Sequence, residues 1–170
     1  VKTVVVLAGG YSSEHEISLA SGQTAFAAFE AAGYRTLFVK VERSVYSLDG
    51  KDVRIEDLGA DYVFNSIHGS PGEDGHISGV LEVLNIPHST CATFQSALTF
   101  NKAQCNAVLR DAGILVPKGE LFNEFPGAAA FKHWQFPVFV KPNCAGSSYG
   151  VSRVEEPPQL EAAFQYAFTE

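Results

Sequence analysis

The 170-residue chain has little positive charge, few cysteines and no long hydrophobic run. Its 12 lysines and arginines are outnumbered by 19 aspartates and glutamates, and the net charge of −7 provides no basic surface for nucleic acid or anionic lipid. Apolar stretches such as residues 136–140 fall far short of the roughly 20 residues that span a bilayer. With 46% hydrophobic residues, the composition is that of a globular protein, which excludes disordered and collagen-like chains.

The three cysteines, Cys91, Cys105 and Cys144, are widely spaced and form no C-x-x-C pair. This pattern favours reduced thiols over a disulfide framework or a zinc ribbon. The apolar run at the N-terminus is too short for a signal peptide and leads directly into a turn. The sequence therefore predicts a cytoplasmic protein whose first apolar run is a buried strand.

Residues 1–100 show the alternation of strands and helices that is typical of a doubly wound parallel sheet. The β-branched run at 3–8 predicts a central strand that is buried on both faces. A capping-box pattern predicts that a helix begins at Ser13 and ends at Gly33. Further strands are expected at residues 34–41, 46–53 (a hairpin), 62–67 and 86–88, with a helix after residue 75.

The pattern changes near residues 98–101, where we place a domain boundary. A largely helical segment over 93–112 is interrupted at Asn101. Beyond it we expect strands at 118–122, 137–141 and 151–154 and helices at 128–134 and 158–168. Three strands leave the edges of a sheet uncovered, so the second domain, residues 101–170, is expected to be incomplete.

The first candidate site is the turn from Gly9 to Glu16, between the first strand and the first helix. Glycines let a ligand approach the backbone there, and a helix N-terminus attracts negative charge. The G-x-G-x-x-G fingerprint is absent, however, and Glu14 and Glu16 would repel a pyrophosphate. The pattern favours a ligand with a positive end, such as an amine. An ordinary tight turn, with Glu14 complementing the helix dipole, fits the pattern equally well.

The second candidate is the loop 68–76, which follows a predicted strand at the edge where open α/β sheets bind ligands. Two histidines and two acids suggest a metal ion, but the intervening prolines and glycines fix no ligand spacing. We therefore favour the alternative in which Glu73 and Asp74 are turn residues, His76 is solvated and only His68 faces the crevice.

The third candidate is Lys141, which ends an apolar strand and precedes a loop of small residues. Its ammonium and the backbone N–H groups and hydroxyls of residues 146–150 can hold phosphate oxygens. The loop is not a Walker A motif, because the lysine precedes the loop. The alternative is a snorkelling lysine beside a flexible hairpin. Cys144 has no recognisable catalytic partner in the sequence and is interpreted as a loop thiol.

These segments resemble, in order and spacing, motifs of the D-alanine:D-alanine ligases of the ATP-grasp superfamily. The motifs are Gly9-Gly10-x-Ser12-x-Glu14-x-Glu16-Ile17-Ser18, His68-Gly69-x-x-Gly72-Glu73-Asp74-Gly75, and Lys141-Pro142 with Gly146-Ser147-Ser148-x-Gly150. Asn101-Lys102 adds to a match that runs through essentially the whole chain. The resemblance implies an α/β fold with an N-terminal doubly wound parallel-sheet domain, which is pre-ATP-grasp and Rossmann-like. This domain, residues 1–100, would precede the first part of an α+β ATP-grasp domain, residues 101–170.

The resemblance also implies which residues bind the first D-alanine. Glu14 matches the glutamate that holds the ammonium of this substrate, and Ser18 would support Glu14 from the first helical turn. His68 matches the histidine near the substrate carboxylate. Ser147 matches a serine that hydrogen-bonds with the glutamate and helps to place the substrate, so Glu14 and Ser147 are the catalytic candidates.

For ATP, the resemblance implies that Lys102 and Lys141 contact the phosphates and that Ser147 and Ser148 help to cover them. Mg²⁺ or Mn²⁺ would neutralise phosphate charge together with the lysines, with metal ligands outside this segment.

The implied reaction joins two D-alanines through an acyl phosphate, in the cytoplasm, to supply a precursor of cell-wall peptidoglycan. Family members are commonly dimers, so a homodimer is expected. They are also about twice as long as this chain, well beyond the scale of one domain, so we expect an N-terminal half that is inactive alone.

Three alternatives stay open. One is a D-alanine:D-lactate type or another ATP-grasp carboxylate–amine ligase. Another is a non-catalytic amino-acid-binding module that keeps Glu14 and His68. A nicotinamide-dependent oxidoreductase is the weakest, because the glycine fingerprint fails. The chain also departs from the family at His15, where many members carry Arg, and at Cys144-Ala145, where charged residues are common.

Overall fold

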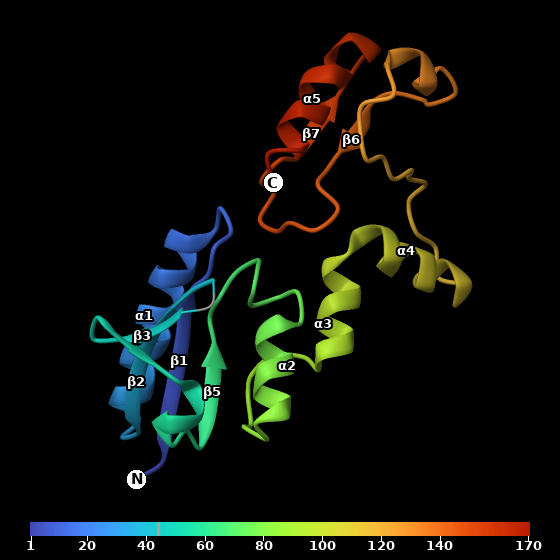
Figure 1. Cartoon of the computed structure of the whole chain (residues 1–170). Helices are drawn as coiled ribbons and strands as arrows, with labels where there is room; N and C mark the ends of the chain where they lie inside the picture. Colours follow the sequence, from blue (N-terminus) through green and yellow to red (C-terminus); the bar gives the residue numbers. More distant parts are fainter. Residues whose placement is uncertain (44) are drawn as a thin grey trace. The chain divides into compact units, whose positions relative to one another are not determined.

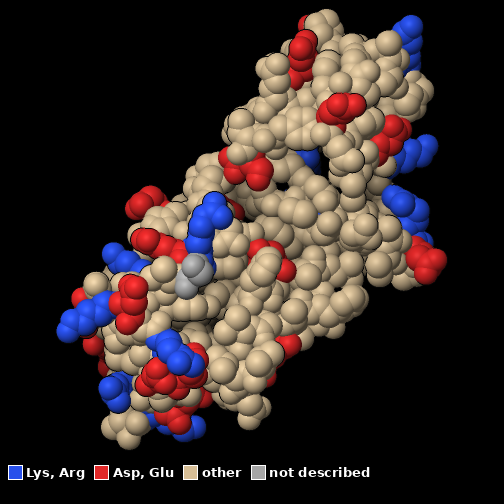
Figure 2. All heavy atoms as spheres, in the orientation of Figure 1, with Lys and Arg blue, Asp and Glu red and all other residues tan. Residues whose placement is uncertain are grey.

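The computed structural model describes residues 1–43 and 45–170. It divides the chain into two compact units, Val1–Thr99 and Phe100–Glu170 (Figure 1). Among the described residues, no helix is both long enough and apolar enough to cross a bilayer. On the face shown in Figure 2, basic and acidic side chains are interspersed and much of the surface carries neither.

The first unit is built on a five-stranded mixed sheet with the order β4-β3-β2-β1-β5. Strand β1 (Thr3–Gly9) is central and runs parallel to β2 (Arg35–Glu42) and β5 (Tyr62–Asn65). The hairpin of β3 (Val45–Leu48) and β4 (Lys51–Val53) adds an antiparallel edge to β2. All seven residues of β1 are buried, which confirms the expectation of a strand covered on both faces.

Helix α1 (His15–Ala31) covers one face of β1 and β2. Gly22 allows this close approach, because a Cβ at Gly22 would lie 2.5 Å from the Cβ of Ala8. On the opposite face, η1 (Ile55–Leu58) and α2 (His76–Val83) complete a cluster of buried aliphatic side chains, namely Val5, Leu7, Val39, Val41, Ile55, Val63, Ile67, Ile77 and Leu81. Each fully buried side chain of this kind contributes about 1.5–3 kcal/mol relative to an exposed one.

Two boundaries in this unit differ from the expected ones. Helix α1 begins at His15 with Glu14 as its N-cap, later than the predicted start at Ser13. The return strand expected at 86–88 is a single bridge between Val63 and His88. The unit continues into α3 (Thr93–Phe100), whose first residue donates its N–H and its hydroxyl to the Glu82 carboxylate at 2.9 and 2.8 Å.

The second unit contains α4 (Lys102–Asp111), the antiparallel pair β6 (Val138–Val140) and β7 (Ser152–Val154), and α5 (Leu160–Ala167) after η3 (Pro157–Gln159). Its core is a small aromatic and aliphatic cluster of Phe131, Val154, Leu160, Ala163 and Phe164, with Phe122, Phe125 and Trp134 packed against it. The break between α3 and α4 falls at Asn101, as the sequence predicts.

Two expected elements of the second unit were wrong. Residues 118–122 form no strand, and the helix expected at 128–134 is the short 3₁₀ segment η2 (Ala128–Phe131). No described strand pairs with residues 118–122. The ring of Phe122 instead packs against Phe131 and Phe164, with centroids 5.2 and 5.6 Å away.

Candidate functional site

The turn after β1 is packed too closely to accept side chains. The Gly10 N–H donates to the Val41 carbonyl oxygen at 2.7 Å, and Gly10 has φ 86°. A Cβ at Gly10 would lie 2.7 Å from Ile67 Cγ2 and 2.9 Å from the Ser70 carbonyl oxygen. The turn therefore requires glycine, both for its left-handed backbone and for space.

Glu14 is the N-cap residue of α1, and only 2% of its surface is exposed. The Ser12 hydroxyl accepts the Glu14 N–H at 3.3 Å and donates to the His68 carbonyl oxygen at 2.9 Å. A Cβ at Gly69 would lie 3.2 Å from Glu14 Oε2, so the carboxylate lies beside the backbone of the loop after β5. Within residues 1–43 and 45–170, the Glu14 carboxylate has no hydrogen-bond or ion-pair partner.

The motifs associate His68 and Ser18 with Glu14, but the two residues have different environments. His68 is half-buried, and its Nε2 lies 3.2 Å from the Ser21 hydroxyl of α1. Ser18 is completely buried; its hydroxyl accepts from the Gly9 N–H at 2.8 Å and donates to the Ser66 carbonyl oxygen at 2.9 Å. These bonds occupy the Ser18 hydroxyl, so any support it gives to Glu14 acts through the position of α1.

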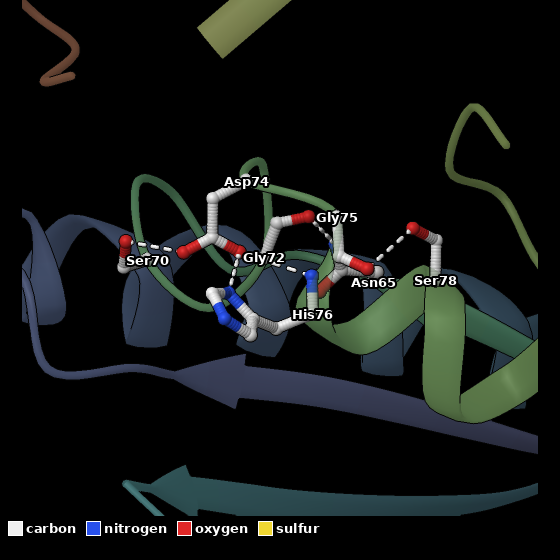
Figure 3. Close-up of polar contacts among 7 residues, drawn as sticks. All are labelled: Asn65, Ser70, Gly72, Asp74, Gly75, His76 and Ser78. Atoms are coloured by element: carbon white, nitrogen blue, oxygen red, sulfur yellow. Dashed lines mark hydrogen bonds and ion pairs between the residues drawn. The ribbon is translucent and has the colours of Figure 1, made fainter. Parts of the chain in front are cut away.

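The acids of the loop 69–76 brace the loop itself, and Figure 3 shows the contacts of one of them, Asp74. The Asp74 carboxylate accepts from the Ser70 hydroxyl at 2.5 Å and lies 2.7 Å from Nδ1 of His76, whose side chain is 71% exposed. Glu73 accepts the Gly69 N–H at 2.9 Å. Asn65 donates to the Gly72 carbonyl oxygen at 3.0 Å. These contacts match the turn interpretation of the two acids. Among the described residues, no group of three or more metal-ligating side chains comes together.

In the second unit, Lys102 and the loop after β6 form a separate candidate site for phosphate. Lys102 is the first residue of α4 and is half-buried; its Nζ donates to the Ala145 carbonyl oxygen at 2.5 Å. Burial lowers the pKa of Lys102 below its ordinary value of 10.5; Cys144 opposes this shift, and the charge of Lys141 adds to it. Lys102 contacts the loop after β6 at Ala145, and Lys141 begins that loop, so both ammonium groups lie near it.

The loop between β6 and β7 has an anchored base and an exposed tip. A Cβ at Gly150 would lie 2.5 Å from Cγ of Pro142, so the two ends of the loop touch. Lys141 directly follows β6, with its Nζ 5.3 Å from the centroid of the Phe139 ring. Ser147 and Ser148, at the tip, are exposed and have φ values of 46° and 65°. The tip therefore presents two hydroxyls from a backbone conformation that non-glycine residues rarely adopt.

Similarity to known proteins extends over nearly the whole chain. A family model described as "D-ala D-ala ligase C-terminus" matches residues 112–170. The D-alanine--D-alanine ligase of Xanthobacter autotrophicus is 45% identical over 162 residues, which cover 93% of this chain and 51% of that protein. The crystal structure of the D-alanine-D-alanine ligase from Helicobacter pylori matches with a TM-score of 0.83 and 29% identity, over 99% of this chain and 61% of that one.

A third match is the VanG D-Ala:D-Ser ligase from Enterococcus faecalis, with a TM-score of 0.77 and 31% identity over 99% of this chain and 60% of that one. The mixed α/β unit and the unit that follows it are thus part of an ATP-grasp ligase fold. The chain belongs to the D-alanine--D-alanine ligase family. It spans about half the length of the curated relatives it matches.

The structure brings together residues that the sequence alone did not connect. Ser12 and Ser21 place Glu14 and His68, and Asn143 contacts the first turn of α4. Ser12 belongs to the first motif, so its small polar side chain was a usable signal. The contact of Asn143 spans 40 positions along the chain, and no local pattern indicates it.

Proposed function

We propose that the protein containing this chain is an ATP-dependent D-alanine--D-alanine ligase. The observation that supports this best is the Glu14 carboxylate, which is almost wholly buried, keeps a little contact with solvent and has no hydrogen-bond or ion-pair partner among the described residues. A buried charge without a partner is costly, and a ligand ammonium would compensate it. The family membership makes the amino group of D-alanine the natural ligand.

In the first unit, Glu14 would bind the ammonium of the first D-alanine and His68 would lie near its carboxylate. The bond from Ser12 to the His68 carbonyl oxygen holds the backbones of these two residues together at the end of the sheet. Ser18 would keep the first turn of α1 in place. This arrangement fits a small zwitterion better than a pyrophosphate, which Glu14 would repel.

In the second unit, Lys102 and Lys141 would bind ATP phosphates, and the tip residues Ser147 and Ser148 would cover them. Two ammonium groups near a loop of small residues suit a polyphosphate in charge and in space. Mg²⁺ or Mn²⁺, when bound, would neutralise further phosphate charge. The contact of Ser147 with Glu14 that the family implies stays a prediction.

These groups answer the chemical requirements of the reaction. A carboxylate oxygen of the first D-alanine attacks the γ-phosphorus of ATP, which gives an acyl phosphate and ADP. The neutral amine of the second D-alanine then attacks the acyl carbon, and phosphate leaves as the peptide bond forms. The first step joins two anions, so the lysines stabilise its transition state by offsetting their repulsion.

A second candidate differs only in the second substrate. The similarity to a D-Ala:D-Ser ligase covers 99% of this chain, so the described fold is shared by ligases with different second substrates. A D-alanine:D-lactate ligase is a further member of this group of hypotheses. Comparing rates with D-alanine, D-serine and D-lactate as the second substrate separates them. A cytoplasmic location and a homodimer accompany the proposal as family expectations.

The deciding experiment is ADP release by the protein from the complete reading frame, with ATP, Mg²⁺ and D-alanine. D-alanine-dependent turnover, without turnover on L-alanine, supports the proposal. Because the chain spans about half the length of its relatives, we expect residues 1–170 alone to release no ADP. Absence of turnover by the complete protein would favour a non-catalytic amino-acid-binding module.

A further inference from the structure

The N–H groups of the first three residues of α4 are each bound by an asparagine. Helices leave their first four N–H groups without partners inside the helix. Here Asn143 accepts two of them, the Lys102 N–H through its carbonyl oxygen at 3.1 Å and the Ala103 N–H through its side-chain Oδ1 at 2.9 Å. The side-chain Oδ1 of Asn101 accepts a third, from Gln104 at 3.0 Å, and its carbonyl oxygen accepts the first bond within the helix, from Cys105 at 2.9 Å.

The two asparagines differ in what they connect. Asn101 directly precedes α4 and is a local N-cap. Asn143 lies in the loop after β6, two residues beyond Lys141, and joins that loop to α4 across 40 positions of the chain. Lys102 Nζ reinforces the same junction through its bond to the Ala145 carbonyl oxygen. Asn143 therefore links both lysines of the candidate phosphate site to one rigid helix end.

We propose that Asn143 is a positioning residue for ATP binding, which fixes the Lys102 ammonium and the base of the loop 141–150 relative to each other. The inference rests on the proposed function only in taking ATP as the ligand. Since the N–H groups of Lys102, Ala103 and Gln104 are already bound by asparagines, they are not available to phosphate, and the lysine side chains are the donors that remain for it. Their relative position then depends on the junction that Asn143 makes.

The test compares N143A with N101A in the protein from the complete reading frame. Each substitution removes one side-chain cap of the same helix, so their losses of stability should be similar. Only N143A also releases the loop. We expect N143A to weaken ATP binding about tenfold, measured by calorimetry without D-alanine, and N101A to change it less than about twofold. In turnover assays, N143A should raise KM for ATP more than it lowers kcat.

Three further measurements make the result specific. Amide hydrogen exchange should speed up at Ala103 in N143A and at Gln104 in N101A. N143D keeps the oxygen acceptor and should restore slow exchange at the Ala103 N–H, although its negative charge would itself repel ATP phosphate. In a K102M background, N143A should weaken ATP binding by less than it does in the wild type, because its effect passes partly through Lys102.

Equal loss of ATP affinity in N143A and N101A would overturn the proposal, as would wild-type affinity in N143A, fast exchange at the Ala103 N–H in N143D or full additivity with K102M. Calorimetry and hydrogen exchange do not depend on ligase turnover. A protein that binds ATP but releases no ADP with D-alanine would therefore refute the proposed function while still testing the role of Asn143.

Discussion

The Ser18 hydroxyl donates a hydrogen bond to the Ser66 carbonyl oxygen at 2.9 Å, just beyond the end of β5. It also accepts the N–H of Gly9, the last residue of β1. One buried hydroxyl thus joins α1 to the ends of two parallel strands. The Ser18 N–H donates to the Glu14 carbonyl oxygen at 2.9 Å, so this junction also determines where Glu14 lies.

Removal of the Ser18 hydroxyl should destabilise the protein. S18A leaves the Gly9 N–H and the Ser66 carbonyl oxygen buried without this partner, and we expect a loss of about 1–3 kcal/mol in the free energy of unfolding. Urea denaturation measures it. T24A is the matched control, because Thr24 is exposed and donates only to the Ala20 carbonyl oxygen of the same helix. Equal stability of the two variants would contradict the role assigned to Ser18.

Replacement of Gly22 and Gly79 by alanine should have opposite effects. Alanine normally stabilises a helix relative to glycine by about 1 kcal/mol. At Gly22 the added Cβ would lie 2.5 Å from Ala8 and 3.1 Å from the Phe38 ring, so we expect G22A to destabilise the protein by about 1–3 kcal/mol. At Gly79 the nearest atom is 3.4 Å away, an ordinary contact, and G79A should stabilise it. Thermal unfolding of both variants tests whether α1 packs as described.

Removal of the Glu14 charge should impair substrate binding without loss of stability. E14Q keeps the shape of the side chain but replaces a charged acceptor for the substrate ammonium, and we expect affinity for D-alanine to fall about tenfold to a hundredfold. The free energy of unfolding should stay the same or rise, because a buried carboxylate without a partner is removed. E16Q is the control, since the Glu16 side chain is 90% exposed. Wild-type D-alanine affinity in E14Q would refute the assignment.

The pH dependence of ATP use should report the environment of Lys102. Burial lowers its pKa below 10.5, so the ammonium loses its proton, and its attraction for phosphate, at a lower pH than an ordinary lysine does. We expect kcat/KM for ATP to fall as the pH rises, with a midpoint below 10.5. K102R should move this midpoint upward because arginine stays protonated, whereas K141R should leave it in place. An unchanged midpoint in K102R would assign the titration to another group.

Local sequence patterns predicted much of the fold. The β-branched run of β1, the hairpin around Asp49-Gly50 and the break at Asn101 all appear in the structure. These features depend on burial, turn chemistry and capping, which act between residues close together in the chain. The same patterns failed at 118–122, because a strand also needs a neighbour to pair with, and this segment has none among the described residues.

The sequence by itself determined the family motifs and the residue types at the two candidate sites. Only the tertiary structure showed that Glu14 is buried beside the loop after β5, that the hydroxyl of Ser18 is occupied by backbone groups, and that Asn143 caps the first turn of α4. Hydrogen bonds between residues 40 or more positions apart leave no periodic signal in the sequence. They arise only when the folded chain brings polar groups together away from water, where each group must find a partner.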